Sequence, residues 1–308
     1  MRVAVVGVGG MGGYFGGLLA RGGADVTLIA RGAHLAAMRE RGLTVRSELY
    51  GEFTVPVRAT DDPIEVGAVD LVLFCVKAYD LEAGARLSAP LVGPETTVIP
   101  VQNGIDIVER LEGILGEGQV LGGMTYVGGK IEAPGVVAQG GAMGELIFGE
   151  LAGGTSERTE RIADFLRGSG IGVELLSDIR SRLWEKFTVI CATGGVLAVA
   201  RLPFGAVFAS PEASELMRGV MGEVENLARA SNAGLAEGTA ERLFDFLKAN
   251  MDPEGRSSQL QDLEAGRRLE LEFLNGTAVR LGRELGVPTP LNFAIYAALK
   301  PHVDGPVD

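Results

Sequence analysis

The chain has 308 residues, of which 46% are hydrophobic, and its formal net charge is −12. This length suggests one large or two ordinary domains, and the apolar content is sufficient for a sizeable core. The acidic balance argues against a general nucleic-acid surface, which needs clustered positive charge. No apolar run is expected to cross a bilayer. The start MRVAVVGVGG lacks the parts of a signal peptide, so we expect a cytoplasmic location and no membrane partner.

The two cysteines, Cys75 and Cys191, lie far apart in the sequence and in apolar surroundings. They are typical of reduced core residues, because a disulfide framework or a metal site needs several cysteines or histidines at short spacing. We therefore expect no metal site.

The first half of the chain alternates strand and helix patterns. Short apolar, β-branched runs predict strands, and the segment after the first run has the spacing of a helix. Such alternation predicts a parallel sheet with right-handed crossovers. The predicted strands are Val3–Gly7, Asp25–Ala30, Leu71–Val76 and Thr96–Val101, and the first predicted helix is Met11–Arg21.

The pattern changes twice further along the chain. After Gly118, glycine turns separate three predicted strands, which we expect to extend the sheet in antiparallel fashion. From about Ser177 the apolar residues follow helical spacing. The predicted strands are Gln119–Val127, Gly135–Gln139 and Glu145–Gly149; the predicted helical segments are Asp178–Ala200, Pro211–Ala233, Glu237–Ala249 and Gln259–Leu285.

These patterns predict an α/β protein with an N-terminal Rossmann dinucleotide-binding domain followed by an all-helical C-terminal domain. We place the first domain at residues 1–176 and the second at residues 177–308, because the strand patterns end there and helical spacing begins.

A G-x-G-x-x-G motif lies directly after the first predicted strand and opens the first predicted helix. Its first glycine permits a tight turn, the second lets the backbone approach a pyrophosphate, and the third allows close helix–strand packing. A merely glycine-rich turn is the alternative in a chain with 46 glycines, but the strand–turn–helix context favours cofactor binding. The assigned residues are Gly7, Val8, Gly9, Gly10, Met11 and Gly12.

The end of the second predicted strand indicates which dinucleotide binds. Enzymes that bind NAD usually have an Asp or Glu there for the ribose 2′-hydroxyl. This chain has Arg31 instead. A guanidinium can bind a 2′-phosphate and stack on adenine. An ordinary surface arginine is the alternative, but the missing acid favours NADPH.

Taken together, several segments resemble the ketopantoate reductase (2-dehydropantoate 2-reductase) family over nearly the whole chain. Single pieces are unspecific, whereas their order and spacing are specific. Beyond the N-terminal segment with its arginine after the second strand, the matching pieces are FCVKAYD at Phe74–Asp80, VQNGID at Val101–Asp106, LWEKF at Leu183–Phe187, SSQLQD at Ser257–Asp262 and LELEFLNG at Leu269–Gly276.

The resemblance implies a Rossmann domain and a helical domain with the active site in the cleft between them. It also implies NADPH-dependent reduction of a 2-oxo acid to a 2-hydroxy acid on the pathway to pantothenate. Lys186 matches the family's catalytic lysine, and its apolar neighbours predict partial desolvation, which would favour proton transfer. A solvated helix lysine is the alternative.

The resemblance assigns further residues to the site. Glu270 matches a carboxylate that partners the lysine, the substrate hydroxyl and the cofactor, although it could be a solvated charge. Ser258 matches the ligand of the substrate carboxylate, although Ser258 and Gln261 also fit a helix capping box. Asn103 and Lys77 match residues near the nicotinamide, and Asn103 also near the substrate, although Asn103-Gly104 is a common turn signal.

The chain departs from the family pattern at several asparagines. Ile190, Gly194 and Phe204 stand where the family has asparagine, and so does Gly255. These changes suggest a more apolar substrate pocket, because lost hydrogen bonds to a substrate hydroxyl alter discrimination strongly.

Three functions therefore remain open. The first is the NADPH-dependent reduction of 2-dehydropantoate to pantoate in pantothenate and coenzyme A biosynthesis. The second is reduction of another, more apolar 2-oxo acid. The third is an NADPH-binding sensor without turnover, against which Lys186 and Glu270 argue. The expected partner is a small 2-oxo acid, and a homodimer is possible.

Overall fold

The computed structural model describes residues 1–306, and contact clustering divides the chain into two compact units. The first unit comprises Met1–Gln102 and Ile107–Ile179; the second comprises Asn103–Asp106 and Arg180–Asp308. The predicted boundary after residue 176 precedes this division, and residue 308, at the end of the predicted second domain, lies outside the described residues. The division also gives the second unit a short loop, Asn103–Asp106, which the sequence analysis put in the first domain.

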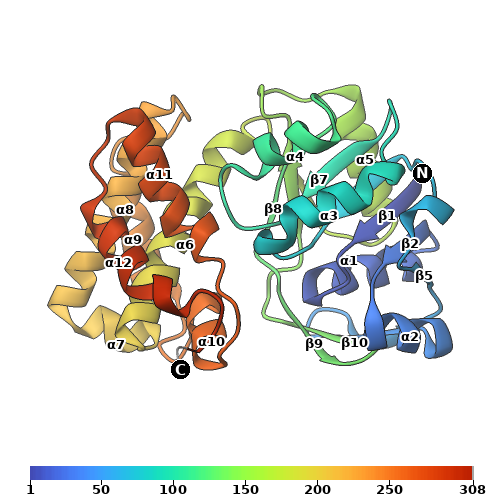
Figure 1. Ribbon diagram of the computed structural model, residues 1–308, viewed down its shortest axis with the longest axis horizontal. Coiled ribbons are helices and arrows are strands. Elements are labelled where there is room, and N and C mark those ends of the chain that lie inside the picture. The colour runs from blue at the N-terminus through green and yellow to red at the C-terminus, as the bar shows by residue number, and fades with distance from the viewer. Residues whose placement is uncertain (307–308) are drawn as a thin grey trace. The chain divides into compact units, whose positions relative to one another are not determined.

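The first unit is built on a five-stranded sheet of order β5-β2-β1-β6-β7 (Figure 1). Every neighbouring pair in this sheet is parallel, which confirms the predicted Rossmann architecture. The strands are β1 (Arg2–Val6), β2 (Asp25–Ile29), β5 (Arg58–Thr60), β6 (Leu71–Phe74) and β7 (Thr97–Pro100); the helices that connect or follow them are α1 (Gly10–Arg21), α2 (Gly32–Arg41), α3 (Leu81–Ser88) and α4 (Ile107–Leu115).

The predicted antiparallel extension of this sheet was wrong. The later strands form two further sheets, of orders β4-β3-β10-β9 and β12-β11-β8. An isolated backbone bridge joins Val98 of β7 to Val120, just before β8. The reason is a competing partner, since β10 pairs in parallel with β3, a strand that the sequence analysis missed. The strands are β3 (Leu43–Ser47), β4 (Gly51–Val55), β8 (Gly122–Thr125), β9 (Gly128–Ala133), β10 (Val136–Gly140), β11 (Leu146–Gly149) and β12 (Val173–Leu175).

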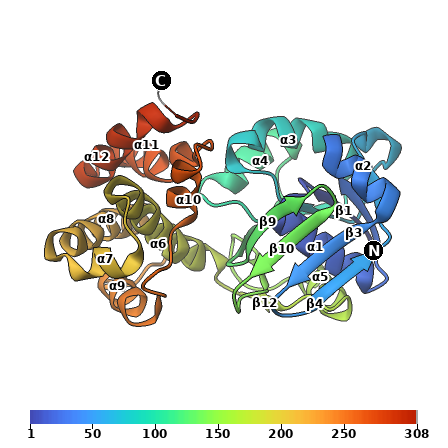
Figure 2. The same ribbon diagram turned by 90° about the horizontal axis from the view of Figure 1, so that it is seen from below.

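Helix α1 packs against strands of two different sheets, and its glycines make both approaches possible (Figure 2). A Cβ on Gly16 would come within 2.6 Å of the Leu28 side chain in β2, whereas a Cβ on Gly13 would come within 2.6 Å of Val137 in β10. A Cβ on Gly17 would come within 2.5 Å of Val45 in β3. Glycine on both faces therefore lets one helix lie in close contact with both layers.

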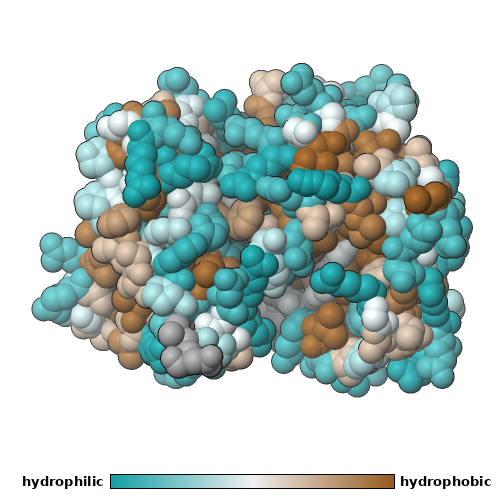
Figure 3. Space-filling view, viewed as in Figure 1, coloured by the Kyte–Doolittle hydropathy of each residue, from teal (hydrophilic) through white to brown (hydrophobic). Residues whose placement is uncertain are grey.

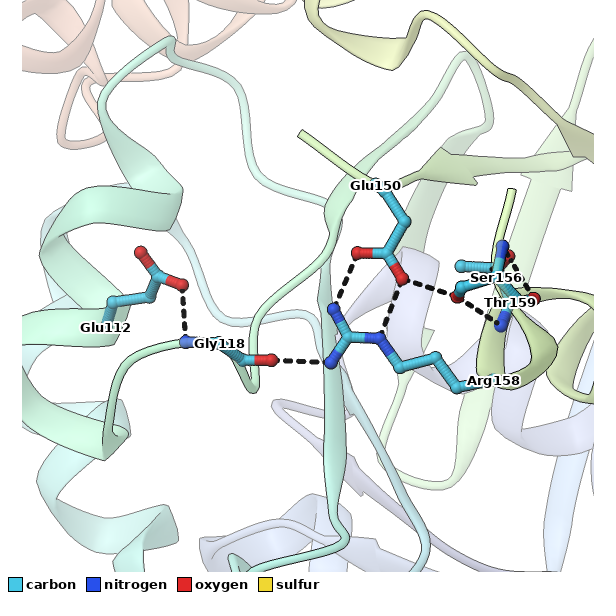
Figure 4. A network of polar contacts seen from close by, with 6 residues as sticks. All are labelled: Glu112, Gly118, Glu150, Ser156, Arg158 and Thr159. Carbon is cyan, nitrogen blue, oxygen red and sulfur yellow. Dashed lines mark hydrogen bonds and ion pairs between the residues drawn. The ribbon is translucent and has the colours of Figure 1, made fainter. Parts of the chain in front are cut away.

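An ion-pair network fixes helix α5 (Glu157–Gly168) to the end of β11 (Figure 4). Ser156 caps the helix, and Arg158 donates to both carboxylate oxygens of Glu150 at 2.8 and 2.6 Å. These hydrogen bonds lower the pKa of Glu150. Arg158 also donates to the Gly118 carbonyl, so the network joins the loop after α4 to α5.

The second unit is helical, as the sequence predicted. Its helices enclose a core of apolar side chains, which includes Trp184, Phe187, Met221 and Phe244. The helices are α6 (Ile179–Ala200), α7 (Phe204–Ala209), α8 (Pro211–Ala230), α9 (Thr239–Asn250), α10 (Ser258–Glu264), α11 (Asn275–Leu285) and α12 (Pro290–Leu299), with 3₁₀ turns at Leu271–Phe273 and Lys300–His302.

The predicted single helical segment Gln259–Leu285 is two helices, and this prediction was wrong. Helix α10 ends at Glu264, and Gly266 follows with a φ of +62°, a conformation that favours glycine and breaks the helix. The connection then passes through Glu270 before α11 begins at Asn275. The break places Glu270 outside regular helix.

Helix α8 contacts α7, α9, α11 and α12, and two of its glutamates cap neighbouring helices. Glu223 accepts from the backbone N–H groups of Leu291 and Asn292, at 2.8 and 2.9 Å, at the start of α12. Glu225 accepts from those of Gly238 and Ala240 at the start of α9. A carboxylate at a helix N-terminus satisfies free N–H groups and complements the helix dipole, so these contacts fix the bundle.

Helix α6 is long and apolar enough to cross a membrane by length and composition alone. Of its most apolar window, 67% is buried inside the protein. The apolar content of α6 is thus explained by its place in the core of the second unit.

Large apolar side chains are exposed on both units. On the face that Figure 3 shows, hydrophobic residues in brown lie among hydrophilic residues in teal. The exposed apolar side chains include Tyr126, Ile131 and Met143 on the first unit and Phe246 and Phe293 on the second. The homodimer stays a prediction, because such scattered residues are normal on a monomer surface.

Two successive glycines of α6 provide a matched test of packing. A Cβ on Gly195 would come within 2.8 Å of Ile295, whereas a Cβ on Gly194 would meet nothing closer than 3.7 Å. We expect Gly195→Ala to lower the free energy of unfolding by about 1–3 kcal/mol. Gly194→Ala should leave it unchanged or raise it by up to about 1 kcal/mol, since alanine favours helix. Denaturant unfolding of both variants measures this, and equal stability of the two would contradict the described packing.

Candidate cofactor and active site

A cavity of about 470 Å³ opens at the carboxyl ends of β1, β2 and β6 in the first unit. In parallel sheets this edge is where ligands bind. The motif residues Gly7, Val8 and Gly9 line the cavity beside Arg31 and Lys77. The other lining residues include Ile29, Ala30, His34, Asp61, Cys75, Val76, Asp80, Gly84 and Ile131.

The motif glycines have the geometry that a dinucleotide requires. Gly7 has a φ of +88°, and a Cβ there would lie 2.7 Å from the Val76 nitrogen. A Cβ on Gly12 would lie 2.2 Å from the Gly7 carbonyl oxygen. A Cβ on Gly9 would meet no protein atom within 4 Å and would project beside the cavity. Gly9 also caps α1 without a side chain, so a phosphate can approach the helix N-terminus.

A fourth glycine, Gly10, is required by packing. A Cβ there would lie only 2.0 Å from the Gly129 backbone in β9. Strand β9 therefore crosses the first turn of α1, in contact with the proposed phosphate loop. The residues of this loop fit a bound dinucleotide. At position 10, however, glycine is required because β9 packs against it.

The charges around Arg31 in this cavity are mixed. The Arg31 side chain is 90% exposed, and its guanidinium lies 3.7 Å from the Asp80 carboxylate, which is 42% exposed. Lys77, also exposed, and Asp61, paired with Arg39 at 3.4 Å, line the same cavity. Arg31 is thus available to an anion. The end of β2 has no carboxylate of its own, but Asp80, directly before α3, brings one close to Arg31.

His34 also lines the cavity, one helical turn after Arg31. Its Nδ1 accepts from the Gly135 backbone N–H at 2.9 Å, which ties α2 to the turn between β9 and β10. Partial burial lowers the pKa of His34. The structure thus gives His34 a packing contact beside the candidate cofactor cavity.

Lys186 lies on α6 in the second unit and is only 7% exposed. The neighbouring side chains of Trp184 and Phe187 are buried and form an edge-to-face pair with ring centroids 5.8 Å apart. Burial lowers the pKa of Lys186 from 10.5 to about 8, and the Glu270 carboxylate acts in the opposite direction. The expected desolvation is therefore present, and near neutral pH the ammonium is an acid that can release its proton.

Glu270 is 9% exposed and directly precedes the 3₁₀ turn Leu271–Phe273. The residues on either side, Leu269 and Leu271, are buried in the core, which fixes the backbone. The side-chain amide of Asn103 donates to the Glu270 carboxylate at 3.3 Å. Three separate motifs predicted Asn103, Glu270 and Lys186. Within the second unit Glu270 connects the other two, because it accepts from Asn103 and interacts electrostatically with Lys186.

The Asn103 loop is attached to the second unit by its own residues. Ile105 packs against the helical core, and Asp106 accepts from Arg280 of α11 at 2.8 Å. Asp106 is 6% exposed, so the carboxylate of this ion pair is buried. These anchors explain why a loop that follows strand β7 belongs to the helical unit.

Ser258 occupies the first turn of α10 and is exposed. The predicted capping box at Ser258 and Gln261 was wrong, because the helix starts at Ser258 and its cap is Ser257. The Ser257 hydroxyl accepts from the Leu260 N–H at 3.2 Å, and the Gln261 amide donates to the Arg256 carbonyl instead. The Ser258 hydroxyl is therefore not occupied by capping.

The positions that depart from the family pattern have different environments. Phe204 is buried in the helical core and stacks on Phe208 at 5.9 Å. Ile190 is half-buried and packs against the same core. Gly194 is buried on α6, with Gln259 and Leu274 as its neighbours. Phe204 therefore serves packing, while Ile190 and Gly194 follow Lys186 at successive helical turns.

Sequence reasoning missed Asp80 and Gln259. Asp80 comes from an element outside the glycine motif, so only the tertiary arrangement brings it to the cavity. Gln259 had no sequence signal beyond its position in the SSQLQD segment. Within residues 1–306 no group of three or more His, Cys, Asp or Glu side chains is arranged to hold a metal ion.

Comparison with known proteins gives matches over both units. The family model described as ketopantoate reductase PanE/ApbA matches residues 3–153, and its C-terminal counterpart matches residues 178–303. A 2-dehydropantoate 2-reductase of Archaeoglobus fulgidus is 34% identical over 292 residues, which cover 94% of each chain.

Solved structures agree with these matches. A PanE/ApbA family ketopantoate reductase from Ralstonia eutropha superimposes with a TM-score of 0.89, at 33% identity and 98% coverage of both chains. A D-mandelate dehydrogenase, solved with NADH and anilino(oxo)acetate, has the same fold with a TM-score of 0.88 and 23% identity, again over 98% of both chains.

The cofactor cavity allows a test that does not depend on turnover. We expect Gly9→Ala to weaken NADPH binding at least tenfold, because the added methyl group would occupy the space that the pyrophosphate needs. The melting temperature should not fall, since no protein atom lies within 4 Å of that methyl position. Fluorescence titration with NADPH and thermal unfolding measure the two effects. Unchanged binding would mean that the cofactor does not lie against this loop.

Proposed function

This chain belongs to the ketopantoate reductase family, and from this membership we propose that it reduces 2-dehydropantoate to pantoate with NADPH. Such a reaction supplies pantoate for pantothenate and coenzyme A biosynthesis. The observation that carries the proposal is the buried Lys186, whose pKa is about 8, beside the Glu270 carboxylate. A proton donor of this kind is what reduction of a ketone requires.

The residues of the first unit would hold the cofactor. Gly7–Gly12 would face the pyrophosphate, Arg31 the 2′-phosphate and Lys77 the nicotinamide half. When bound, NADPH supplies the hydride that the ketone carbon accepts. The N-terminus of α1 and the Arg31 guanidinium would offset the charge of the cofactor phosphates in a chain whose net charge is −12.

Lys186 would act at the ketone oxygen. Negative charge grows on that oxygen as the carbon is reduced, and the Lys186 ammonium would stabilise it and then transfer a proton. With a pKa of about 8, the amine is mostly protonated at neutral pH and still releases its proton readily. A solvated lysine with a pKa of 10.5 would be a much weaker acid.

Glu270 would keep Lys186 charged and receive a hydrogen bond from the new hydroxyl group. Asn103 donates to Glu270 and would orient that carboxylate towards the substrate and the nicotinamide. Ser258, with an exposed hydroxyl at the first turn of α10, would bind the substrate carboxylate at the positive end of that helix.

A second candidate function follows from Ile190. This residue replaces an asparagine one helical turn after Lys186, so it presents a branched apolar side chain where the family has an amide. A reductase of a more apolar 2-oxo acid is the activity that this substitution favours. The steps at Lys186 and Glu270 would be the same for both substrates.

The cofactor proposal is tested at Arg31 and Asp80. We expect Arg31→Ala to weaken NADPH binding about tenfold or more and to leave NADH binding nearly unchanged, because a charge-assisted contact to the 2′-phosphate is lost. Asp80→Asn should strengthen NADPH binding, since it removes a negative charge 3.7 Å from the guanidinium. Titration of both cofactors against each variant measures this. An Arg31→Ala protein with an unaltered preference would contradict the assignment of NADPH.

The proton donor is tested by pH dependence. We expect the rate of 2-dehydropantoate reduction to be high below pH 8 and to fall above it, because Lys186 then loses the proton that it must donate. Glu270→Gln should move this limb to lower pH, since the carboxylate raises the pKa of Lys186. Lys186→Met should lower kcat at least about 100-fold.

Lys248→Met is the matched control for this experiment, because Lys248 is an exposed lysine on α9. It should leave both kcat and the pH profile unchanged. Near-normal turnover by the Lys186→Met protein would rule out Lys186 as the acid. A limb near pH 10 in the wild type would show that the working lysine is not desolvated.

A further inference from the structure

Gln259 is the most unusual polar residue in the second unit. It is 3% exposed, and neither its Nε2 nor its Oε1 atom has a hydrogen-bond partner. Among the described residues, the other buried side chains with an unsatisfied atom lack one partner each, whereas Gln259 lacks both. Burying an amide in this way is costly, so such a group needs an explanation.

The amide lies beside Gly194 of α6. A Cβ on Gly194 would lie 3.7 Å from the Gln259 Cβ and 3.8 Å from its Nε2. Gly194 stands where the family pattern has an asparagine, which sequence analysis took as the loss of a substrate contact. The Gln259 amide, which reaches this place from α10, lies in van der Waals contact with the position where the side chain of that asparagine would begin.

Gly194 belongs to the same face of α6 as Lys186. Residues four and eight positions after Lys186 are rotated by about 40° and 80° from it, and the second lies about 12 Å further along the helix axis. These residues are Ile190 and Gly194. The face therefore runs from the proton donor, past one apolar side chain, to the Gln259 amide.

The segment from Glu270 to Leu274 lies along this face of α6. At its start Glu270 interacts electrostatically with Lys186, and at its end the Leu274 side chain would lie 3.7 Å from a Cβ on Gly194. The next residue, Asn275, has a buried Oδ1 without a partner, 3.1 Å from the Cβ position of Gly195. Gly195 is rotated by about 100° from Gly194, so this second unsatisfied atom lies on a neighbouring face of α6.

The chemistry of these atoms selects a ligand. Gln259 offers one donor group and one acceptor. A carboxylate, which only accepts, would be repelled by the Oε1 atom of this amide. A hydroxyl group donates to one oxygen and accepts from the amide N–H, so it satisfies both atoms of Gln259. An apolar group would satisfy neither.

We propose that Gln259 is a specificity-determining residue whose amide hydrogen-bonds a hydroxyl group on the substrate's side chain, in place of the asparagine absent at Gly194. This inference rests on the proposed function. Two departures from the family pattern would then differ in effect. Ile190 makes the site more apolar near the ketone, whereas beside Gly194 the Gln259 amide restores a polar contact further along α6.

Two 2-oxo acids that differ by a single hydroxyl group test the proposal. They are 2-dehydropantoate and 3,3-dimethyl-2-oxobutanoate, which is the same acid without its hydroxyl. We expect the wild type to reduce 2-dehydropantoate with at least tenfold higher kcat/KM. In Gln259→Met this ratio should fall towards one, because the variant keeps the length of the side chain but removes its hydrogen bonds.

Controls separate this role from a structural one. Gln261→Met, an exposed substitution on the same helix, should keep the wild-type ratio. Adding Gly194→Asn to Gln259→Met should restore part of the ratio, because a Cβ fits at position 194. NADPH affinity and the pH limb of Lys186 should be the same in all these variants, and their melting temperatures should not fall.

The outcomes distinguish two failures. If the wild type reduces both acids equally well, or if Gln259→Met keeps the wild-type ratio, Gln259 does not contact the substrate and the inference is wrong. A lower melting temperature of Gln259→Met with an unchanged ratio would assign the amide to folding alone. If the wild type reduces neither acid with NADPH, the proposed function itself is wrong.

Discussion

The burial of Lys186 is the constraint on which the account of this protein depends. A charged amine is stable in an apolar setting only when a partner carboxylate compensates it or when it gives up its proton. Here both happen in part, since burial lowers the pKa to about 8 while Glu270 keeps it from falling further. The break between α10 and α11, the buried residues beside Glu270 and the anchored Asn103 loop all serve to hold that carboxylate in place.

Much of the fold followed from the sequence, because local patterns carry it. The strand–turn–helix at Gly7–Gly12 and the helical spacing after residue 177 predicted the parallel sheet and the helical unit. The two smaller sheets could not be predicted, since they depend on non-local pairing, above all that of β10 with β3. Gly13 and Gly17, which bring α1 to the second layer, lie beyond the nucleotide motif, and no local pattern indicates which strand they contact.

The candidate site was predictable where a motif marked it. Motif positions selected Lys186, Glu270 and Asn103, and these residues are connected in the structure. Residues whose importance comes from their surroundings were missed, because their types are common on any surface. Asp80 matters through its 3.7 Å approach to Arg31, and Gln259 through the absence of any partner for its buried amide. The prediction of a more apolar pocket changes as well. Phe204 lies in the core, and Gln259 brings an amide to Gly194.

The most direct test of the account is the titration of Lys186 itself. The chain has five lysines (Lys77, Lys130, Lys186, Lys248 and Lys300), so each ε-carbon can be resolved by NMR in protein labelled with ¹³C-lysine. The account predicts that one resonance, absent from the Lys186→Met spectrum, titrates with a pKa of about 8. It also predicts that Glu270→Gln lowers this value. A Lys186 resonance that titrates near 10.5, or one that Glu270→Gln leaves unchanged, would contradict the buried, carboxylate-supported acid at the centre of the proposal.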